Sequence, residues 1–259
     1  MPAADDLTVL IEAAREAGEI LRGCFTKGSK AWEKPDAAGP VTEADLAANA
    51  ALHARLTAAR PGYGWLSEEG PEDPARHVAS RAFVVDPLDG TRAFIEGDHS
   101  WAIALAVVDG PRVSAGVVYL PMRDMLYAAA RGQGATRNGA ALSVRSRDVL
   151  DGATVLSSRT NFEAWHWREA HVPQVRRQFR SSLAYRLSLV AEGRYDAMLR
   201  LRPAREWDVA AGSLLVEEAG GRITDRKGAA LHFNQPDPLF NGLVAAAPSL
   251  QADILSRLV

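Results

Sequence analysis

The chain has 259 residues, of which 47% are hydrophobic and 24% are charged, and its formal net charge is −2. This composition is typical of a globular protein and excludes disorder for most of the chain, because disordered chains combine few apolar residues with a high net charge. With 30 basic residues against 32 acidic ones, the charge balance argues against binding to a nucleic acid polymer.

The sequence also favours a cytoplasmic location. The longest uninterrupted apolar run covers residues 101–108 and is far shorter than the roughly 20 residues of a membrane-spanning helix. The first residues carry acid where a secretory signal needs base. Cys24 is the only cysteine, so it forms no internal disulfide and no thiolate metal site. We therefore expect no membrane partner.

Two helices are predicted in the N-terminal part from the spacing of apolar residues. The first covers residues 5–24, with Asp5 or Asp6 as its cap, and the second covers residues 42–59. Residues 25–40, which are rich in Gly, Lys, Pro and Asp, are expected to form a loop. The inward-facing residues of the second helix are expected to be Leu46, Ala50, His53 and Leu56 or their neighbours.

The next part of the chain indicates β structure. A short apolar run at residues 83–85 predicts a strand that ends at Asp86. Residues 101–108 and 112–120 flank a turn and predict a β-hairpin. A further strand is expected at residues 127–131, followed by a tight turn at Asn138 and Gly139.

The C-terminal part alternates strands and helices. Residues 149–157 open it, the helices are expected at 182–192 and 209–219, and a buried strand at 243–247 precedes a closing helix at 250–258. Hairpin-paired strands followed by alternating elements predict a mixed α/β (α+β) fold. We place a soft boundary near residue 150, which divides the chain into parts 1–150 and 151–259.

Carboxylates concentrate in four short stretches, each of which also has a simpler explanation. Thr42 and Asp45 have the spacing of a capping box, and Glu68 with Glu69 would suit an exposed loop. Asp208 could cap the helix that follows it. The fourth stretch, residues 86–90, could be only a turn.

The fourth stretch nevertheless predicts a metal site. Asp86 and Asp89 lie three residues apart across a Pro-Leu turn, so both carboxylates and the Leu88 carbonyl can aim at one point. Two carboxylates at a strand end are costly unless a cation neutralises them. Such hard oxygen ligands prefer Mg²⁺ or Mn²⁺ to zinc. Gly90 and Thr91 then open a short helix, whose free N–H groups can bind a phosphate oxygen.

At this point the sequence resembles a known family. Residues 86–94, DPLDGTRAF, resemble the DPxDGTxxF signature of the inositol monophosphatase family of lithium-sensitive, magnesium-dependent phosphatases. Residues 207–212 and 218–221, WDVAAG and EAGG, resemble its second signature, and residues 41–45 and 67–69 match its two upstream acidic elements. Four elements in family order and spacing are a strong signal, and the resemblance covers nearly the whole chain.

The resemblance implies a layered αβαβα sandwich with metal ions between its two parts. By similarity, Glu68, Asp86 and the Leu88 carbonyl hold a first Mg²⁺, and Asp86, Asp89 and Asp208 hold a second. Glu68 reaches a weaker third ion through water. Mn²⁺ is expected to substitute for Mg²⁺, and Li⁺ is expected to inhibit.

The resemblance also implies the catalytic groups. Asp45 and Thr91, with the metal ligand Glu68, are expected to orient and deprotonate the attacking water, and the Gly90 and Thr91 N–H groups, together with Asp208, to bind the substrate. The metals neutralise the phosphate, activate the water and stabilise the leaving alkoxide. No nucleophilic side chain is needed, because transfer requires in-line geometry.

Some details look like the 3′(2′),5′-bisphosphate nucleotidase branch of the family. They include Pro40, the LSEE sequence at residues 66–69, Glu206 before the second signature, and residues 182–186 and 231–238. The basic stretch at residues 202–205 departs from the pattern.

The substrate side is expected to use Ser182, Tyr185 and Arg186, although ordinary helix-surface chemistry would explain them equally well. An arginine suits a second phosphate because its planar fork binds two oxygens.

The preferred hypothesis is a nucleotidase that removes phosphate from adenosine 3′,5′-bisphosphate. The alternative within the class is an inositol-1-monophosphatase, with histidinol-phosphate or fructose-bisphosphate activity more distant. The alternative from another class is a non-catalytic phosphate-binding scaffold. A small phosphorylated molecule is the expected partner in each case, and both a monomer and a homodimer are compatible with the sequence.

Overall fold

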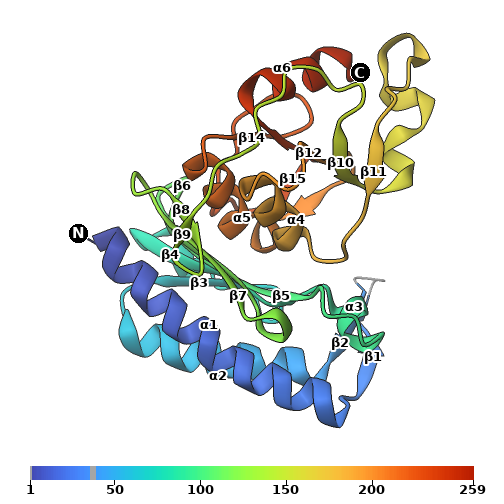
Figure 1. Ribbon diagram of the computed structural model, residues 1–259. Helices are drawn as coiled ribbons and strands as arrows, with labels where there is room; N and C mark the ends of the chain where they lie inside the picture. The colour runs from blue at the N-terminus through green and yellow to red at the C-terminus, as the bar shows by residue number, and fades with distance from the viewer. Residues whose placement is uncertain (1, 36–38) are drawn as a thin grey trace.

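The computed structural model describes residues 2–35 and 39–259 and shows five layers, helix–sheet–helix–sheet–helix (Figure 1). The outer helix layer comes from the N-terminus, and the opposite outer layer contains the C-terminal helix α6, Pro248–Arg257. The mixed α/β class and the layered sandwich are therefore confirmed. None of the described helices combines the length and apolar content that a bilayer crossing requires.

Helices α1 (Pro2–Lys27) and α2 (Glu43–Ala59) cover one face of the first sheet (Figure 1). Helix α1 begins before the predicted start, so Asp5 and Asp6 are not caps. Asp6 is instead buried, and its carboxylate pairs with the guanidinium groups of Arg60 at 2.8 Å and Arg81 at 3.2 Å.

The predicted inner face of α2 is wrong apart from Leu56. Leu46, Ala50 and His53 are exposed. The helix is rich in alanine on several sides, so apolar spacing alone could not select the buried face. The face that packs inward is Ala44, Ala48, Leu52 and Leu56.

The first sheet has the order β3-β4-β5-β6-β7-β8-β9; β3 and β4 are parallel and the other pairs are antiparallel. Alternate residues of β4 serve two cores: Phe83 faces α1 and α2, and Val84 faces the central helices. The predicted hairpin and the Asn138–Gly139 turn are confirmed. The strands are β3 Gly64–Ser67, β4 Arg81–Asp89, β5 Ala102–Asp109, β6 Arg112–Leu120, β7 Met125–Ala130, β8 Ala135–Arg137 and β9 Ala140–Ala141.

The expected loop at residues 25–40 is more ordered than predicted. Its first residues continue α1, and Ala31–Glu33 forms β1, which pairs with β2, Pro40–Thr42, in an antiparallel ladder. Residues 36–38 lie outside the described chain. A short ladder carried by three residues leaves no apolar periodicity to detect.

The central layer consists of α4 (Leu183–Ala191) and α5 (Glu206–Glu218), which pack between the two sheets (Figure 1). Both were predicted, although α5 begins before Asp208, whose side chain therefore lies in the first turn and is not the N-cap. The core around these helices includes residues from both halves of the chain. The division near residue 150 stays a prediction.

The second sheet has the order β11-β10-β12-β16-β14 and carries α6 on its far face (Figure 1). Its strands are β10 Thr154–Ser157, β11 Arg176–Gln178, β12 Ala197–Arg200, β14 Arg222–Thr224 and β16 Leu243–Ala246. The remaining elements are α3 Thr91–Ile95, the pair β13 Ala204–Arg205 and β15 Leu239–Phe240, and the 3-10 helices Pro74–His77, Pro121–Arg123, Arg159–Phe162, Ala164–His166 and Arg168–Ala170.

A close approach between β6 and α5 leads to a prediction. A Cβ added at Gly116 would lie 3.0 Å from the Ala211 Cα, so a larger side chain pushes α5 off the sheet. We expect Gly116→Val to cost about 1–3 kcal/mol of stability, which lowers the thermal midpoint by roughly 2–12 °C for a chain of this size. Gly23→Val is the matched control, because nothing lies near its Cβ; an equal loss in both variants contradicts the prediction.

Candidate active site

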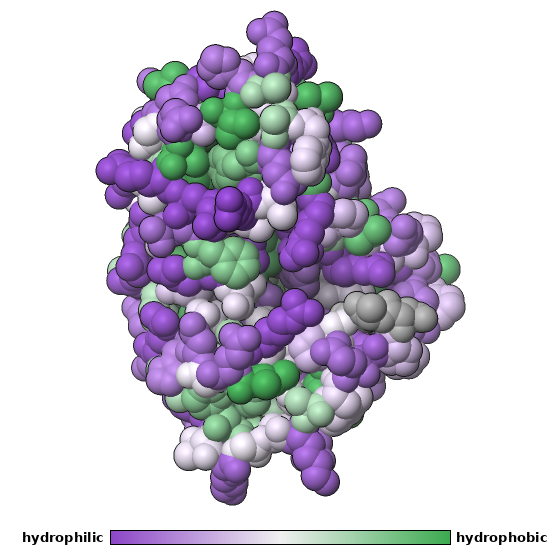
Figure 2. Space-filling view, turned by 90° about the vertical axis from the view of Figure 1, so that its right-hand side faces the viewer, coloured by the Kyte–Doolittle hydropathy of each residue, from purple (hydrophilic) through white to green (hydrophobic). Residues whose placement is uncertain are grey.

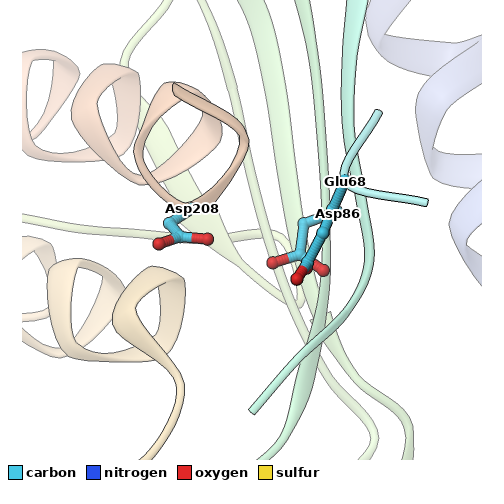
Figure 3. Close-up of side chains that lie close together, drawn as sticks. All are labelled: Glu68, Asp86 and Asp208. Carbon is cyan, nitrogen blue, oxygen red and sulfur yellow. The ribbon is translucent and has the colours of Figure 1, made fainter. Parts of the chain in front are cut away.

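Three carboxylates from separate elements converge at one place. Glu68 follows β3, Asp86 lies in β4 and Asp208 lies in the first turn of α5. One oxygen from each lies within 4.8 Å of the others. Figure 3 shows Asp208 reaching from α5 toward Glu68 and Asp86, which lie beside each other on the side of the sheet. The Glu68 N–H donates to the Val85 carbonyl at 3.1 Å, which holds Glu68 beside β4.

Asp86 is the most constrained member of this cluster. It is 1% exposed; its Oδ1 accepts the Leu88 N–H at 3.0 Å, and its Oδ2 is buried with no hydrogen-bond partner among the described residues. Burial, and then the charges of Glu68 and Asp89, raise its pKa well above the ordinary value. A buried carboxylate oxygen with neither donor nor cation is costly. Asp86 Oδ2 is therefore a candidate metal ligand.

Asp208 has the same electrostatic difficulty. Burial raises its pKa, and the charges of Asp89 and Glu68 add to the effect, while Arg200 and Arg186 oppose it. The donors around the cluster are carboxylate oxygens, the set that Mg²⁺ or Mn²⁺ prefers. The residues present thus fit a hard divalent cation.

Asp89 ties the end of β4 to helix α4. Its Oδ2 accepts the Ser182 hydroxyl at 2.7 Å and the Ala184 N–H at 2.6 Å. Burial raises the pKa of Asp89, while these hydrogen bonds lower it. The carboxylate also lines the cavity beside Glu68 and Asp208, although it lies outside the tight group of three.

Among the described residues, neither Ser182 nor Tyr185 lines the cavity. The Ser182 hydroxyl accepts the Tyr185 N–H at 2.9 Å and caps α4 while it donates to Asp89. Tyr185 is 2% exposed and belongs to the central core. The Ser182 hydroxyl thus holds Asp89 and the start of α4, and its predicted contact with the substrate stays a prediction.

Asp45 satisfies both interpretations that the sequence allowed. Its Oδ2 accepts the Thr42 N–H at 2.8 Å and completes a capping box with Thr42 at the start of α2. Its Oδ1 accepts the Thr91 hydroxyl at 3.2 Å. Burial raises the pKa of Asp45, and the hydrogen bonds from Thr42 lower it. One carboxylate thus anchors a helix and presents a proton acceptor to the site.

Thr91 begins α3 at the end of β4. Its hydroxyl also lies 3.2 Å from the Leu88 carbonyl, so its single proton can go to Asp45 or to Leu88. Gly90 precedes it with φ +98°, where side chains are disfavoured, and a Cβ there would lie 3.3 Å from the Ser182 nitrogen. The first N–H groups of α3 have no acceptor within the helix.

Lys34 supplies a positive charge that the sequence analysis missed. Its Nζ lies 2.8 Å from Glu68 Oε1 and 2.5 Å from Glu69 Oε1. Burial raises the pKa of Glu69 to about 7, against the effect of Lys34. The lysine comes from the region treated as a loop, where no pattern marks it.

Glu206 and Arg76 hold the start of α5; the sequence analysis named Glu206 only as a detail of the nucleotidase branch and missed Arg76. Glu206 is fully buried, and its two carboxylate oxygens accept the N–H groups of Asn234 at 2.7 Å and Gln235 at 3.0 Å. The equally buried Arg76 donates to the Asn234 side-chain oxygen at 2.6 Å and to the Gln235 carbonyl at 2.8 Å. Together they fix the helix turn that carries Asp208. Burial raises the pKa of Glu206 to about 7.

The acidic cluster opens into a cavity of about 670 Å³. Figure 2 shows the molecule from this side, with a hollow at mid-height bordered mainly by hydrophilic residues. Arg186 was expected at the site and lines this cavity, and Arg200 and Phe179 join it unpredicted. The full lining is Gly39, Pro40, Glu68, Asp89, Gly90, Thr91, Arg92, Glu96, Phe179, Ser181, Leu183, Arg186, Arg200, Arg202 and Asp208.

Comparisons with known proteins agree on one family. The sequence model of the inositol monophosphatase family matches residues 4–259. The chain is 36% identical to an inositol-1-monophosphatase of Rhizobium meliloti and 34% identical to the Nus factor SuhB of Salmonella typhimurium, covering 86% of this chain and 86% and 85% of those proteins. A solved structure of a Thermotoga maritima IMPase superposes with a TM-score of 0.84 at 26% identity, covering 97% of this chain and 96% of that one.

The crowding at Asp86 predicts how stability responds to metal. Because the pKa of Asp86 is raised in the folded state, the metal-free protein loses stability as pH rises above the ordinary carboxyl range. Asp86→Asn removes that penalty, so its metal-free thermal midpoint at pH 7 should equal or exceed that of the unmodified protein.

Mg²⁺ should stabilise the unmodified protein much more than it stabilises Asp86→Asn. At 100-fold above its Kd, an ion that binds only the folded state adds about 2.7 kcal/mol, or roughly 5–10 °C at this chain length. The variant should show little of this shift, and Asp148→Asn, an exposed carboxylate, should show all of it. An undiminished Mg²⁺ shift in Asp86→Asn would remove Asp86 from the metal site.

Proposed function

The chain belongs to the inositol monophosphatase family, and from this premise we propose that it is a magnesium-dependent phosphomonoester hydrolase that uses a metal-activated water. The observation that carries the proposal is the convergence of Glu68, Asp86 and Asp208 beside the Asp45–Thr91 pair. A protein that only binds phosphate has no use for a hydroxyl paired with a buried carboxylate. This argues against the alternative of a non-catalytic scaffold. We expect the enzyme in the cytoplasm, as its composition suggests.

The ligand assignment follows the family resemblance, and the convergence of Glu68, Asp86 and Asp208 supports it. Glu68, Asp86 and the Leu88 carbonyl would hold one Mg²⁺, and Asp86, Asp89 and Asp208 would hold a second. Asp86 Oδ2, which has no hydrogen-bond partner among the described residues, is free for this role. Glu68 would reach a third, weaker ion through water. Bound Mg²⁺ would lower the pKa of a water and neutralise charge on the phosphate and the leaving oxygen.

Thr91 and Asp45 would move the proton. Thr91 Oγ1 would orient the attacking water and accept its proton while passing its own to Asp45 Oδ1, 3.2 Å away. The raised pKa of Asp45 makes that carboxylate a stronger base than an exposed one. The other oxygen of Asp45 stays fixed by the helix cap, so the acceptor is already oriented. The N–H groups of Gly90 and Thr91 would bind the phosphate oxygens.

The substrate proposed is adenosine 3′,5′-bisphosphate, with inositol 1-phosphate as the alternative. Arg186 supports the first, because its buried guanidinium lines the same cavity as Glu68 and Asp208. The alternative is supported by the Rhizobium meliloti relative, which is named an inositol-1-monophosphatase. Inositol 1-phosphate offers no second phosphate for an arginine to bind.

Phosphate release tests the proposal directly. We expect release from adenosine 3′,5′-bisphosphate with Mg²⁺, loss of release with a chelator, and inhibition by Li⁺. Mn²⁺ should restore activity to the chelated enzyme. Faster release from inositol 1-phosphate would select the alternative substrate. Absence of release from every phosphomonoester tested would favour the scaffold instead.

A pair of substitutions at Thr91 tests the proton path. Thr91→Val keeps the shape and removes the hydroxyl, so kcat should fall by about 10²- to 10⁴-fold, the usual contribution of positioned acid–base groups. Thr91→Ser keeps the hydroxyl and should stay within about tenfold of the unmodified enzyme. Both should retain the Mg²⁺-induced rise in thermal midpoint. Equal rates for the valine and serine variants would show that the hydroxyl carries no proton.

A further inference from the structure

The cavity beside the acidic cluster has a basic wall. Arg186 of α4, Arg200 at the end of β12 and Arg202 just beyond it line the same cavity as Glu68 and Asp208. Within residues 2–35 and 39–259, no carboxylate lies within ion-pair distance of any of these three guanidinium groups. Three unpaired arginines that share one cavity indicate an anion that binds there.

The environment of Arg186 is the strongest evidence for an anion in this cavity. The residue is 4% exposed, and its Nε is buried with no hydrogen-bond partner among the described residues. Its Nη2 donates to the Ser181 carbonyl at 3.0 Å, and the guanidinium lies 4.7 Å from the centre of the Phe179 ring. Burial lowers its pKa to about 10. A buried arginine without a paired acid is rare and costly unless a ligand supplies the negative charge.

Arg200 and Arg202 add to the positive charge. Arg200 is partly buried and donates from Nε to the Pro203 carbonyl at 3.0 Å. Burial lowers the pKa of Arg200, and Arg202 lowers it further against the attraction of Asp208. The two side chains therefore repel each other, a cost that a bound anion would relieve.

Arg205, in the same basic stretch as Arg202 (residues 202–205), has partners of its own and does not face the cavity. Its Nη1 lies 3.7 Å from Asp237 Oδ1, and its guanidinium lies 5.6 Å from the centre of the Trp207 ring. Arg205 is absent from the described residues that line the cavity. The basic stretch that departs from the family pattern therefore divides into Arg202, which faces the cavity with Arg200, and Arg205, which has partners of its own.

We propose that Arg186, Arg200 and Arg202 form a subsite for a second phosphate group, so that the preferred substrates are small bisphosphates. This inference rests on the proposed hydrolase function. The phosphate to be cleaved would bind at the acidic, metal-holding wall, and the second would bind at the arginines. Guanidinium groups bind phosphate through paired N–H donors, and three of them suit a dianion better than a single carboxylate. A cavity of about 670 Å³ falls within the size of ligand pockets, large enough for more than one phosphate.

Matched substrate pairs isolate the second phosphate. One pair is adenosine 3′,5′-bisphosphate and adenosine 3′-monophosphate, and the other is fructose 1,6-bisphosphate and fructose 1-phosphate. For the unmodified enzyme with Mg²⁺, kcat/KM should be at least tenfold higher for the bisphosphate in one or both pairs. A preference in only one pair shows whether the substrate carries its phosphates on a nucleoside or on a sugar. Equal values within both pairs overturn the subsite while leaving the hydrolase function standing. No release from any of the four substrates or from inositol 1-phosphate overturns the hydrolase function itself.

Variants at the exposed end of the wall then assign the residues. Because Arg186 is buried, the test uses Arg200→Ala and Arg202→Ala. Each should lower kcat/KM for the preferred bisphosphate by about 10- to 100-fold, the usual loss for a charged hydrogen bond, mainly through KM. The loss for the matching monophosphate should be at least fivefold smaller. Arg200→Lys and Arg202→Lys should recover part of it, because they restore the charge without the fork.

Arg205→Ala is the control and should match the unmodified enzyme on both members of the pair. If Arg200→Ala and Arg202→Ala lower activity on monophosphate and bisphosphate equally, the arginines do not read the second phosphate. If the lysine variants recover nothing while the thermal midpoint has fallen, the arginines have only a structural role. Either result overturns the proposal.

Discussion

The active site depends on the repulsion between the buried carboxylate of Asp86 and its half-buried neighbours, Glu68 and Asp208. Asp86 lies at the centre, with one oxygen held by the Leu88 N–H and the other without a partner. Glu68 and Asp208 reach the same place from the first sheet and from α5 (Figure 3). The folded chain tolerates this charge only at a cost to its own stability, which a divalent cation repays. The rest of the architecture keeps the acids from moving apart.

Several contacts far from the reacting atoms supply that restraint. Gly116 allows α5 to lie against β6, so that Asp208 comes close to the strand that carries Asp86. Glu206 and Arg76 fix the segment beside the start of α5. Ser182 joins α4 to Asp89. Ser182 thus both caps α4 and positions Asp89, so a structural interpretation of such a residue does not exclude a functional one.

Local patterns in the sequence predicted most elements, and the family resemblance predicted that Glu68, Asp86 and Asp208 converge. The hairpin of β5 and β6 and the helices α4 and α5 have clear periodicity or turn residues, and the DPLDGT stretch carries its chemistry in adjacent positions. The buried face of α2 escaped prediction because alanine on several sides gives no contrast. Arg76 and Arg200 escaped for another reason: their roles come from partners or a shared cavity far away in sequence, and no local spacing records such meetings.

The acidic and the basic residues of the cavity partly stabilise each other's charge. Arg200 and Arg186 lower the pKa of Asp208, and Asp89 and Asp208 favour the charged form of Arg186 in return. Neither wall neutralises the other by direct contact, because no ion pair joins them in the part of the chain that the structure describes. The acids therefore remain available for cations and the arginines for an anion. A molecule with one phosphate at each wall would satisfy both demands, which a monophosphate cannot do.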